Sequence, residues 1–512
     1  MPEIKLPRLV ITGASGFIGR NFIEMFKEQF QIFAIARRSQ QEVGLPRHKN
    51  INWHLADIAD QNSIHEIMEG IRQEGGADYF IHLAAFFDFS NEPNPEYERT
   101  NINGSEIIFE EAASLGLKRF IFASSLVVSE FPKIGETLTE TSSLDANFPY
   151  AVTKIVGEAM AEKWSESFPC TVVRFAAVFS DWCEYGPLYK FLDTWSSRSW
   201  KSNVLGGAGN SAVPYIHIVC LSRMLRSVLE QSDQLKPFDV LIASPDASTS
   251  HQELYDLSTR FVFGEQRRAI HMPIPLARLG VIMLDLLGRV IGKRPFERPW
   301  MMKYVDQRME VDAAYTRDTL KWNTIPRYSL ERRILHVIEH MKTFPVEWHH
   351  KNSLALFKSP DRPNLRIAEA LTLQETKILT SLQYLVTAPE NESRFPSYQK
   401  METEKLAWYF GILFNLLKVS VRTGDRLAMA NYARFIASIR IHEGFNLAEV
   451  VDVYQSLSDI VIHNLLTQST IRNLERRIRD DIDLTIQMAI DEVEDAYDIA
   501  LAPASYTRFH NR

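Results

Sequence analysis

Residues 8–28 carry the pattern that most restricts how this chain can fold. The apolar run Leu9-Val10-Ile11 predicts a strand, and a helical pattern of apolar residues begins at Phe17. Between them, glycines recur at a spacing of three residues. A strand, a glycine turn and a helix in this order place a pyrophosphate on the free N–H groups and the positive end of the helix. The pattern predicts a dinucleotide-binding loop made of Gly13, Ser15, Gly16, Phe17, Ile18 and Gly19.

Length and composition limit the class of protein. With 512 residues the chain is long enough for two or three domains, and a hydrophobic content of 45% supports large cores. A formal net charge of −7 and a pI near 6.1 argue against nucleic acid as a partner. Three cysteines cannot form a disulfide framework and have no metal-ligand spacing. We therefore expect no bound metal. The sequence also contains no run of 18 uncharged apolar residues that would predict a membrane-spanning helix, so we expect a cytoplasmic protein.

The first part of the chain alternates predicted strands and helices. Strands are predicted over 8–12, 31–36, 51–54, 78–83, 119–124 and 171–175, and helices over 17–28, 61–73, 101–115 and 150–166. This alternation predicts an α/β fold, a Rossmann doubly wound parallel sheet with right-handed crossovers. From about residue 180 the pattern is irregular, so we expect a small substrate lobe that completes a domain over residues 1–348.

The C-terminal part of the chain has a different composition. Residues 349–364 are mostly polar and predict a linker. Residues 365–512 contain few glycines or prolines and show apolar residues at helical spacing, which predicts an all-α bundle of about five helices. Asn446 is the expected cap of a helix that begins at Leu447.

Several polar or small residues follow the predicted strands. Asp57-Ile58 come after the third strand, where a carboxylate can accept hydrogen bonds from an adenine amino group; a surface helix cap is the alternative. Leu83-Ala84-Ala85 follow the fourth strand, and small residues there let a cofactor pass close to the backbone. Ser125 ends the fifth strand and is placed to polarise a substrate oxygen.

Tyr150 and Lys154 are separated by one helical turn, which puts both side chains on one face. A phenol with a pKa near 10 is a poor base at neutral pH. A nearby ammonium stabilises the phenolate, so we expect Lys154 to lower the pKa of Tyr150 and let it exchange a proton with a hydroxyl or carbonyl. Lys154 is also expected to bind the nicotinamide ribose. An isolated Tyr-x-x-x-Lys is usually an ordinary amphipathic helix, but its position after the glycine loop and Ser125 favours catalysis.

Together these motifs resemble a known family. The matching segments are Thr12 to Gly19, Asp57, His82 to Ala85, Asn101 to Ser105, Ser124-Ser125, Tyr150 with Lys154, Tyr215 to Ile218, and Leu320-Lys321-Trp322. With them, residues 8 to about 345 resemble the extended short-chain dehydrogenase/reductase family, also called the NAD-dependent epimerase/dehydratase family. The resemblance implies a nicotinamide cofactor, a catalytic set of Ser125, Tyr150 and Lys154, and a homo-oligomer, most often a dimer.

The end of the second predicted strand bears on the cofactor. An acidic residue there would accept hydrogen bonds from the adenosine ribose and repel a 2′-phosphate, but the chain has Arg37-Arg38. Arginines offer charge and forked donors to a phosphate, so we expect NADP(H), with NAD(H) as the other option. The alternative is that these arginines are solvated or stack on adenine.

Departures from the family pattern limit which reactions of the family this chain is expected to catalyse. Where dehydratases of the family usually have Asp-Glu, this chain has Leu126-Val127, and Ala177 stands where nucleotide-sugar enzymes usually have Asn. Aromatic residues are frequent after residue 180, and residues 276–292 are almost uniformly apolar. These features favour hydride transfer to a steroid-like or lipid-like carbonyl; a nucleotide-sugar epimerase is the alternative. The apolar segment is either a buried helix or a contact with a membrane surface that is at most peripheral.

The predicted bundle carries a second resemblance. Arg422 to Asp425, Tyr432 to Phe435 and Arg440 to Val450 are similar to the RsbR-type N-terminal helical domain of stressosome proteins. That resemblance implies dimerisation, sensing, or a protein partner. It raises the alternative that the chain is a regulatory protein that senses NADP(H) and reports through the bundle.

Overall fold

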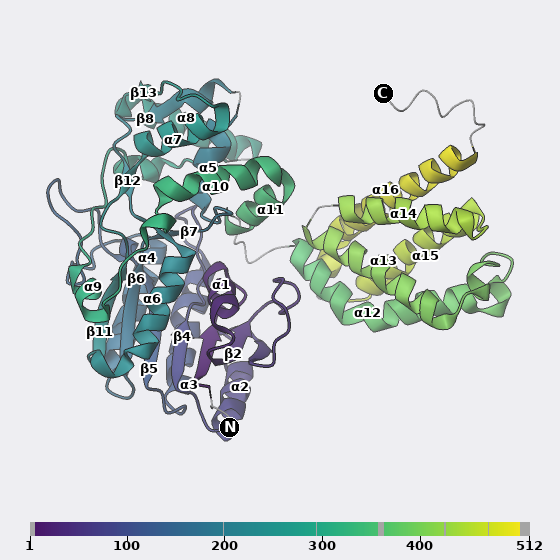
Figure 1. The fold of residues 1–512 in the computed structure, drawn as a ribbon, viewed down its shortest axis with the longest axis horizontal. Helices are drawn as coiled ribbons and strands as arrows, with labels where there is room; N and C mark the ends of the chain where they lie inside the picture. The colour runs from purple at the N-terminus through teal and green to yellow at the C-terminus, as the bar shows by residue number, and fades with distance from the viewer. Residues whose placement is uncertain are drawn as a thin grey trace. The chain divides into compact units, whose positions relative to one another are not determined.

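The computed structural model describes residues 6–197, 199–292, 294–356, 363–423, 426–468 and 471–501. The chain divides into two compact units, Met1–Lys358 and Ser359–Arg512 (Figure 1). Over the described ranges, no helix combines the length and the apolar character needed to cross a membrane.

A seven-stranded parallel sheet forms the centre of the first unit. Its strands are β1 (Arg8–Thr12), β2 (Gln31–Ala36), β3 (Ile51–Leu55), β4 (Tyr79–His82), β5 (Arg119–Ser125), β6 (Cys170–Phe175) and β11 (Phe238–Ala243). Their order is β11-β6-β5-β4-β1-β2-β3, and all neighbours run parallel. This confirms the doubly wound Rossmann sheet. The seventh strand, β11, is missing from the sequence prediction, because a short apolar run in an irregular region does not reveal that it pairs with β6.

Helices cover both faces of this sheet (Figure 1). On one face, α1 (Phe17–Phe26) and α6 (Ile218–Glu230) pack over Leu9 and Ile11. On the other face, α2 (Gln61–Gln73), α3 (Gly104–Ala112) and α4 (Pro149–Trp164) share a core with Val10. The alternation along β1 follows from the two-residue period of a strand that is buried on both sides. A π-helical turn, Tyr97–Asn103, leads into α3 where a single helix over 101–115 was expected.

The strand order reverses between β1 and β4. The chain leaves β1 toward β2 and leaves β4 toward β5, on opposite sides of this point. In open α/β sheets, ligands bind in the crevice that such a reversal creates at the carboxyl ends of the strands. The predicted glycine loop and the Leu83-Ala84-Ala85 segment both begin at this edge.

The lobe of the first unit consists of short paired strands and helices. The pairs are β7 (Ala177–Phe179) with β10 (Tyr215–His217), β8 (Val204–Gly206) with β13 (Ile270–Met272), and β9 (Ala212–Val213) with β12 (Thr249–Ser250). Its larger helices are α5 (Gly186–Trp195), α7 (His251–Phe263), α8 (Ile274–Ile291), α10 (Leu330–Thr343) and α11 (Pro345–Leu356), and α9 (Ala314–Leu320) packs on β11.

The predicted linker over 349–364 is wrong in its first half. Helix α11 continues to Leu356, with Trp348 and Asn352 fully buried. The Asn352 side chain donates to the carbonyl oxygens of Trp182 and Trp348, each at 2.8 Å. This segment is polar overall, yet it forms a helix that packs on the lobe through the side chains of Trp348 and Asn352. Residues 357–362 of the predicted linker lie outside the described residues, and α12 begins at Pro363.

The second unit is helical, as the sequence predicts. Its long helices are α12 (Pro363–Thr387), α13 (Thr403–Thr423), α14 (Leu427–His442), α15 (Leu447–Leu466) and α16 (Glu475–Leu501), which enclose a separate apolar core. The predicted cap is confirmed, because the Asn446 side chain accepts a hydrogen bond from the Ala448 N–H at 3.1 Å at the start of α15.

Candidate functional site

The glycine loop has the backbone geometry that the sequence predicts. Gly13 has a φ of +69°, and a Cβ there would lie 2.7 Å from the backbone nitrogen of Ala84. A Cβ on Gly19 would lie 2.6 Å from the carbonyl oxygen of Gly13. Gly16 caps α1 without a side-chain hydrogen bond, so the first-turn N–H groups are not covered by a capping side chain. This cradle suits the pyrophosphate of a dinucleotide, since only glycines allow strand, turn and helix to approach so closely.

The other assigned loop residues differ in exposure. Ser15 is buried and its carbonyl oxygen accepts a hydrogen bond from the Arg38 guanidinium, while Phe17 and Ile18 are partly exposed. The Arg20 guanidinium lies over the Phe17 ring, 5.6 Å from its centroid. The loop is thus bounded by two arginines, from α1 and from the end of β2.

Arg37, Arg38 and Asp57 lie together at the carboxyl ends of β2 and β3. The Arg37 guanidinium is 3.9 Å from the Asp57 carboxylate, which also accepts a hydrogen bond of 2.9 Å from Arg99. Arg37 keeps 56% of its side chain exposed. Ile58, by contrast, packs its side chain into the core against Gly104, so this side chain is not available to a ligand.

Leu83, Ala84 and Ala85 leave β4 beside the glycine loop, and a buried histidine supports them. His82 Nδ1 is 2.6 Å from Thr12 Oγ1, and its Nε2 is 3.0 Å from Ser105 Oγ. Burial lowers the pKa of His82 to about 3, with Lys154 as a second cause, so the imidazole is neutral. This histidine joins the carboxyl ends of β1 and β4 and carries no charge into the site.

Ser125, Tyr150 and Lys154 gather around the carboxyl end of β5. Ser125 is the last residue of β5, and α4 packs on this strand. The Lys154 ammonium donates a hydrogen bond of 2.7 Å to the Ala123 carbonyl oxygen and lies 5.8 Å from the centroid of the Tyr150 ring. Helix α4 therefore presents both predicted side chains to this strand end, as the one-turn spacing requires.

The protonation of Tyr150 differs from the sequence expectation. Burial raises the pKa of its phenol above the ordinary value, and the neighbouring Tyr97 adds to the shift. The net shift is upward, so the lowering expected from Lys154 does not outweigh the effect of burial. A phenol in this setting holds its proton at neutral pH, which suits a proton donor better than a base.

Aromatic side chains surround Tyr150. The Phe87 ring lies 4.6 Å from the Tyr150 ring, and Phe89 lies 4.5 Å from Phe87. Phe89 contacts Phe296 of the lobe at 5.8 Å. Phe86, by contrast, is buried and packs against Tyr97, with ring centroids 4.9 Å apart. Leu126 is buried and Ala177 lies in β7, so neither departure from the family pattern adds a polar group here.

Sequence reasoning did not assign several residues that hold the site together. The Asn101 amide accepts a 2.6 Å hydrogen bond from the Phe86 N–H and donates one of 3.0 Å to Thr153, which joins the loop after β4 to α4. Asn101 falls within a segment that carried the family resemblance, so its role was detectable. Arg20 of α1 pairs with Glu184, and the Glu184 N–H donates to Asn352 at 2.7 Å. No local pattern shows these contacts, because they join residues more than 150 positions apart.

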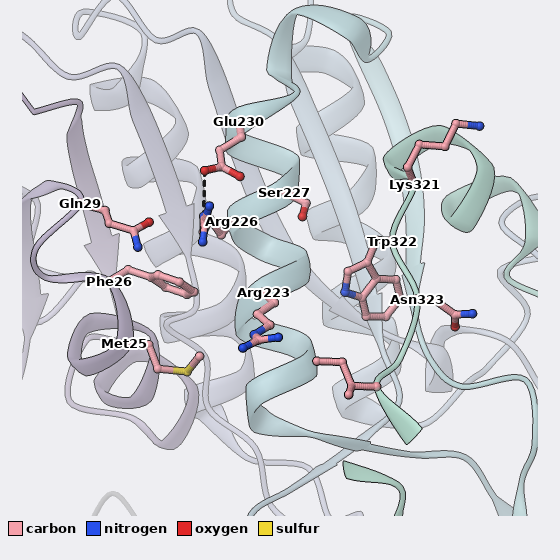
Figure 2. Close-up of a pocket in the computed structure, with 11 residues that line it drawn as sticks. Met25, Phe26, Gln29, Arg223, Arg226, Ser227, Glu230, Lys321, Trp322 and Asn323 are labelled. Atoms are coloured by element: carbon pink, nitrogen blue, oxygen red, sulfur yellow. Dashed lines mark hydrogen bonds and ion pairs between the residues drawn. The ribbon is translucent and has the colours of Figure 1, made fainter. Parts of the chain in front are cut away.

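A surface pocket elsewhere on the first unit is shown in Figure 2. Side chains at the end of α1, such as Phe26, face Arg223 and Arg226 of α6 and the segment around Trp322. Arg226 and Glu230 form an ion pair of 2.8 Å there. Since α1 spans ten residues, at about 1.5 Å per residue, this pocket lies at the end of the helix opposite the glycine loop. It is separate from the candidate cofactor site.

Comparisons with known proteins agree with this geometry. Residues 9–243 match the model of the NAD dependent epimerase/dehydratase family. A uronate dehydrogenase of Pseudomonas syringae pv. tomato is 27% identical over 197 residues, which are 36% of this chain and 68% of that protein. A 3beta-hydroxysteroid-dehydrogenase/decarboxylase of Arabidopsis thaliana is 23% identical over 391 residues, which are 68% of this chain and 85% of that protein.

Solved structures share the fold. A UDP-N-acetylglucosamine 4-epimerase from Methanobrevibacter ruminantium M1, in complex with UDP-N-acetylmuramic acid, matches with a TM-score of 0.51 and 18% identity over 66% of this chain and 99% of that one. This likeness concerns the fold alone. Over residues 9–243, just under half of its length, the chain is similar to the NAD dependent epimerase/dehydratase family.

Proposed function

We propose that the first unit is an oxidoreductase that transfers hydride between NADP(H) and a lipophilic carbonyl or alcohol. The observation that carries this proposal is the apolar setting of Tyr150, whose phenol contacts Phe87 and is followed outward by Phe89 and Phe296. Rings of this kind favour an apolar substrate, because a sugar nucleotide would leave its hydroxyl and phosphate groups unpaired there.

The residues have distinct roles in this reaction. A nicotinamide held at this site would supply the hydride in reduction and accept it in oxidation. Tyr150 donates its phenolic proton to the carbonyl oxygen in reduction and takes it back in oxidation. Ser125 holds the same oxygen by a hydrogen bond, and Lys154 fixes the ribose from its position beside the Ala123 carbonyl. The apolar Leu126 and Val127 have no proton to offer, so an elimination step has no acid or base from these positions.

The preference for NADP(H) rests on the two arginines after β2. Arg38 is held over the glycine loop by the Ser15 carbonyl, and Arg37 extends beside it, half exposed. The nearby Asp57 carboxylate is already hydrogen-bonded by Arg99, so it does not cancel both arginine charges. Calorimetric titration with NADPH and NADH tests this assignment. Arg37→Ala should weaken NADPH binding about tenfold while changing NADH binding little, as expected for a charge-assisted contact with a phosphate. Tighter binding of NADH by the unaltered protein would contradict the preference.

The activity itself is tested by NADPH oxidation with a panel of lipophilic ketones and aldehydes. The proposal expects turnover that Tyr150→Phe abolishes and that Tyr384→Phe, a substitution of an exposed tyrosine in α12, leaves unchanged. The same panel includes UDP-sugars. Epimerisation of a UDP-sugar without net NADPH oxidation would replace this proposal with the epimerase alternative.

A further inference from the structure

Helix α8 turns an apolar surface outward from the lobe. Of its residues, Ala277, Asp285 and Gly288 are buried, and at 100° per residue these three lie along one narrow strip. The opposite side carries large exposed side chains: Leu276 59%, Leu279 56%, Met283 62%, Leu286 57%, Leu287 55% and Val290 86%. A helix on a water-facing surface normally has polar residues on this side.

This exposure decides between the two expectations for residues 276–292. A buried lobe helix is wrong, since only Ala277, Asp285 and Gly288 of α8 are buried; α8 packs on the segment Pro299–Tyr304 and, through Ala277, close to β8 (Figure 1). The strip itself is firmly held. The Asp285 carboxylate accepts hydrogen bonds from Arg294 at 2.8 Å and from Arg289 and Arg298 at 3.1 Å. The Arg294 guanidinium, followed by that of Arg289, lowers the pKa of Asp285 to about 2. The outward side is therefore a fixed feature of the lobe, and a contiguous apolar surface of this kind marks an interaction site.

The charge around α8 indicates what covers it. Residues 265–303 contain eight Lys and Arg residues against three acidic residues, in a chain whose formal net charge is −7; Glu92 and Glu130, from outside this range, pair with Arg294 and Lys303, which still leaves an excess of basic residues. Two of the basic residues, Arg278 and Arg289, are eleven positions apart, which places them on the same flank of α8. Both are exposed. A second copy of this chain would bring an equally basic surface against this one, whereas anionic lipid headgroups complement it.

We propose that α8 is an interfacial helix that binds an anionic membrane surface. Its apolar side lies at the boundary between headgroups and acyl chains, and its basic flank meets the lipid phosphates. With 18 residues, and with Asp285 tied into the lobe, the helix lies along the surface and does not cross it. The occupant is thus a lipid bilayer, and peripheral binding keeps the rest of the lobe in water.

The segment after α8 connects this surface to the candidate catalytic residues. Trp300 stacks on Phe148, the residue before the first turn of α4, with ring centroids 6.5 Å apart. Phe296 contacts Phe89, which leads through Phe87 to Tyr150. If the proposed function holds, on which this step rests, the substrate is a lipophilic carbonyl compound dissolved in the membrane that reaches Tyr150 past these rings.

Vesicle flotation of the full-length protein tests the surface. The probes are phosphatidylcholine vesicles with and without phosphatidylglycerol, at low and high salt. We expect binding to the anionic vesicles that high salt weakens. The double substitution Leu279→Glu/Met283→Glu should reduce bound protein at least tenfold, and Arg278→Glu should reduce it on the order of tenfold, because each basic side chain near an anionic surface strengthens binding about fivefold. Ile134→Glu, at a fully exposed loop position, is the matched control and should bind as the unaltered protein does.

Two results would overturn the proposal. One is vesicle binding that Leu279→Glu/Met283→Glu leaves unchanged. The other is an absence of vesicle binding together with a dimer, seen by light scattering, that the same substitutions dissociate; α8 would then be a protein interface. Because α8 is exposed, NADPH affinity should be equal in all variants and reports that each has folded. If the proposed function is wrong, the protein will float with anionic vesicles but will not reduce the carbonyl compounds. If the membrane site is wrong, the protein will reduce the carbonyl compounds but will not float with the vesicles.

Discussion

Replacing Gly13 with alanine tests how the glycine loop depends on the strand beside it. Gly13 has a φ of +69°, and a left-handed backbone costs about 1–2 kcal/mol for a residue with a side chain. The new Cβ would lie 2.7–2.9 Å from three backbone atoms of Leu83 and Ala84, none of which can rotate away. Overpacking of this kind costs about 1–3 kcal/mol. Gly13→Ala should therefore lower the free energy of unfolding of the first unit by about 2–5 kcal/mol.

Gly116→Ala provides a matched control. Gly116 has a φ of +74°, close to that of Gly13, but a Cβ there meets nothing within 4 Å. The control should lose only the backbone contribution of about 1–2 kcal/mol. The difference between the two variants measures the steric contact with the segment after β4.

Urea denaturation, followed by circular dichroism with and without NADPH, provides the measurement. The chain has two units, so the transition that NADPH shifts to higher urea belongs to the first. Relief of the clash would move the loop or the Leu83-Ala84 backbone, so Gly13→Ala should also weaken NADPH binding more than tenfold while Gly116→Ala does not. Equal destabilisation of the two variants, or unchanged NADPH binding in Gly13→Ala, would refute the steric argument.

Three further predictions concern the site and its supports. Because burial raises the pKa of Tyr150, kcat/KM for carbonyl reduction should stay constant from about pH 6 through pH 10, the ordinary pKa of a phenol, since the buried phenol keeps its proton there; a decline centred near pH 7 would contradict this. Glu158→Gln should destabilise the first unit by about 3–5 kcal/mol in urea, because it leaves the buried Arg174 guanidinium, now 2.8 Å from the carboxylate, without its counter-charge; the double substitution Glu158→Leu/Arg174→Met should lose clearly less. Asn352→Ala removes the amide that accepts from the Glu184 N–H, next to two non-glycine residues of positive φ, Cys183 and Glu184. Asn352→Ala should lower the free energy of unfolding of the first unit by about 1–3 kcal/mol and raise KM for the carbonyl substrate. An unchanged KM would show that the turn at Cys183 and Glu184 does not position the lobe.

The parts of the fold that the sequence predicts well are those with a local cause. The bounds of β1, β2 and α2 agree with the predicted ranges to the residue. Each is set by an apolar run or period that nearby turn and cap residues end. The glycine loop and the Asn446 cap belong to the same class, because backbone conformation and capping depend on neighbours within a few positions.

The candidate site was only partly predictable, because much of its geometry depends on contacts between distant segments of the chain. Spacing places Tyr150 and Lys154 on one face of α4, but the pKa of Tyr150 depends on its burial and on the neighbouring Tyr97. Ile58 follows the third strand as predicted, yet its side chain points into the core. The contact of Arg20 with Glu184 and the anchoring of Glu184 by Asn352 join distant segments, and no pattern in the sequence marks them.

Helix α8 shows this division most clearly. Its apolar composition is plain in the sequence and predicts a helix that must be covered. Composition cannot distinguish a helix covered by its own protein from one left for a partner, because both have the same residues. Only the packing of the lobe, which uses the strip of Ala277, Asp285 and Gly288 and leaves the rest outside, shows which case applies. Local conformation follows from short-range sterics and hydrogen bonds within the chain, whereas burial, pKa and exposed surface follow from which distant segments pack together.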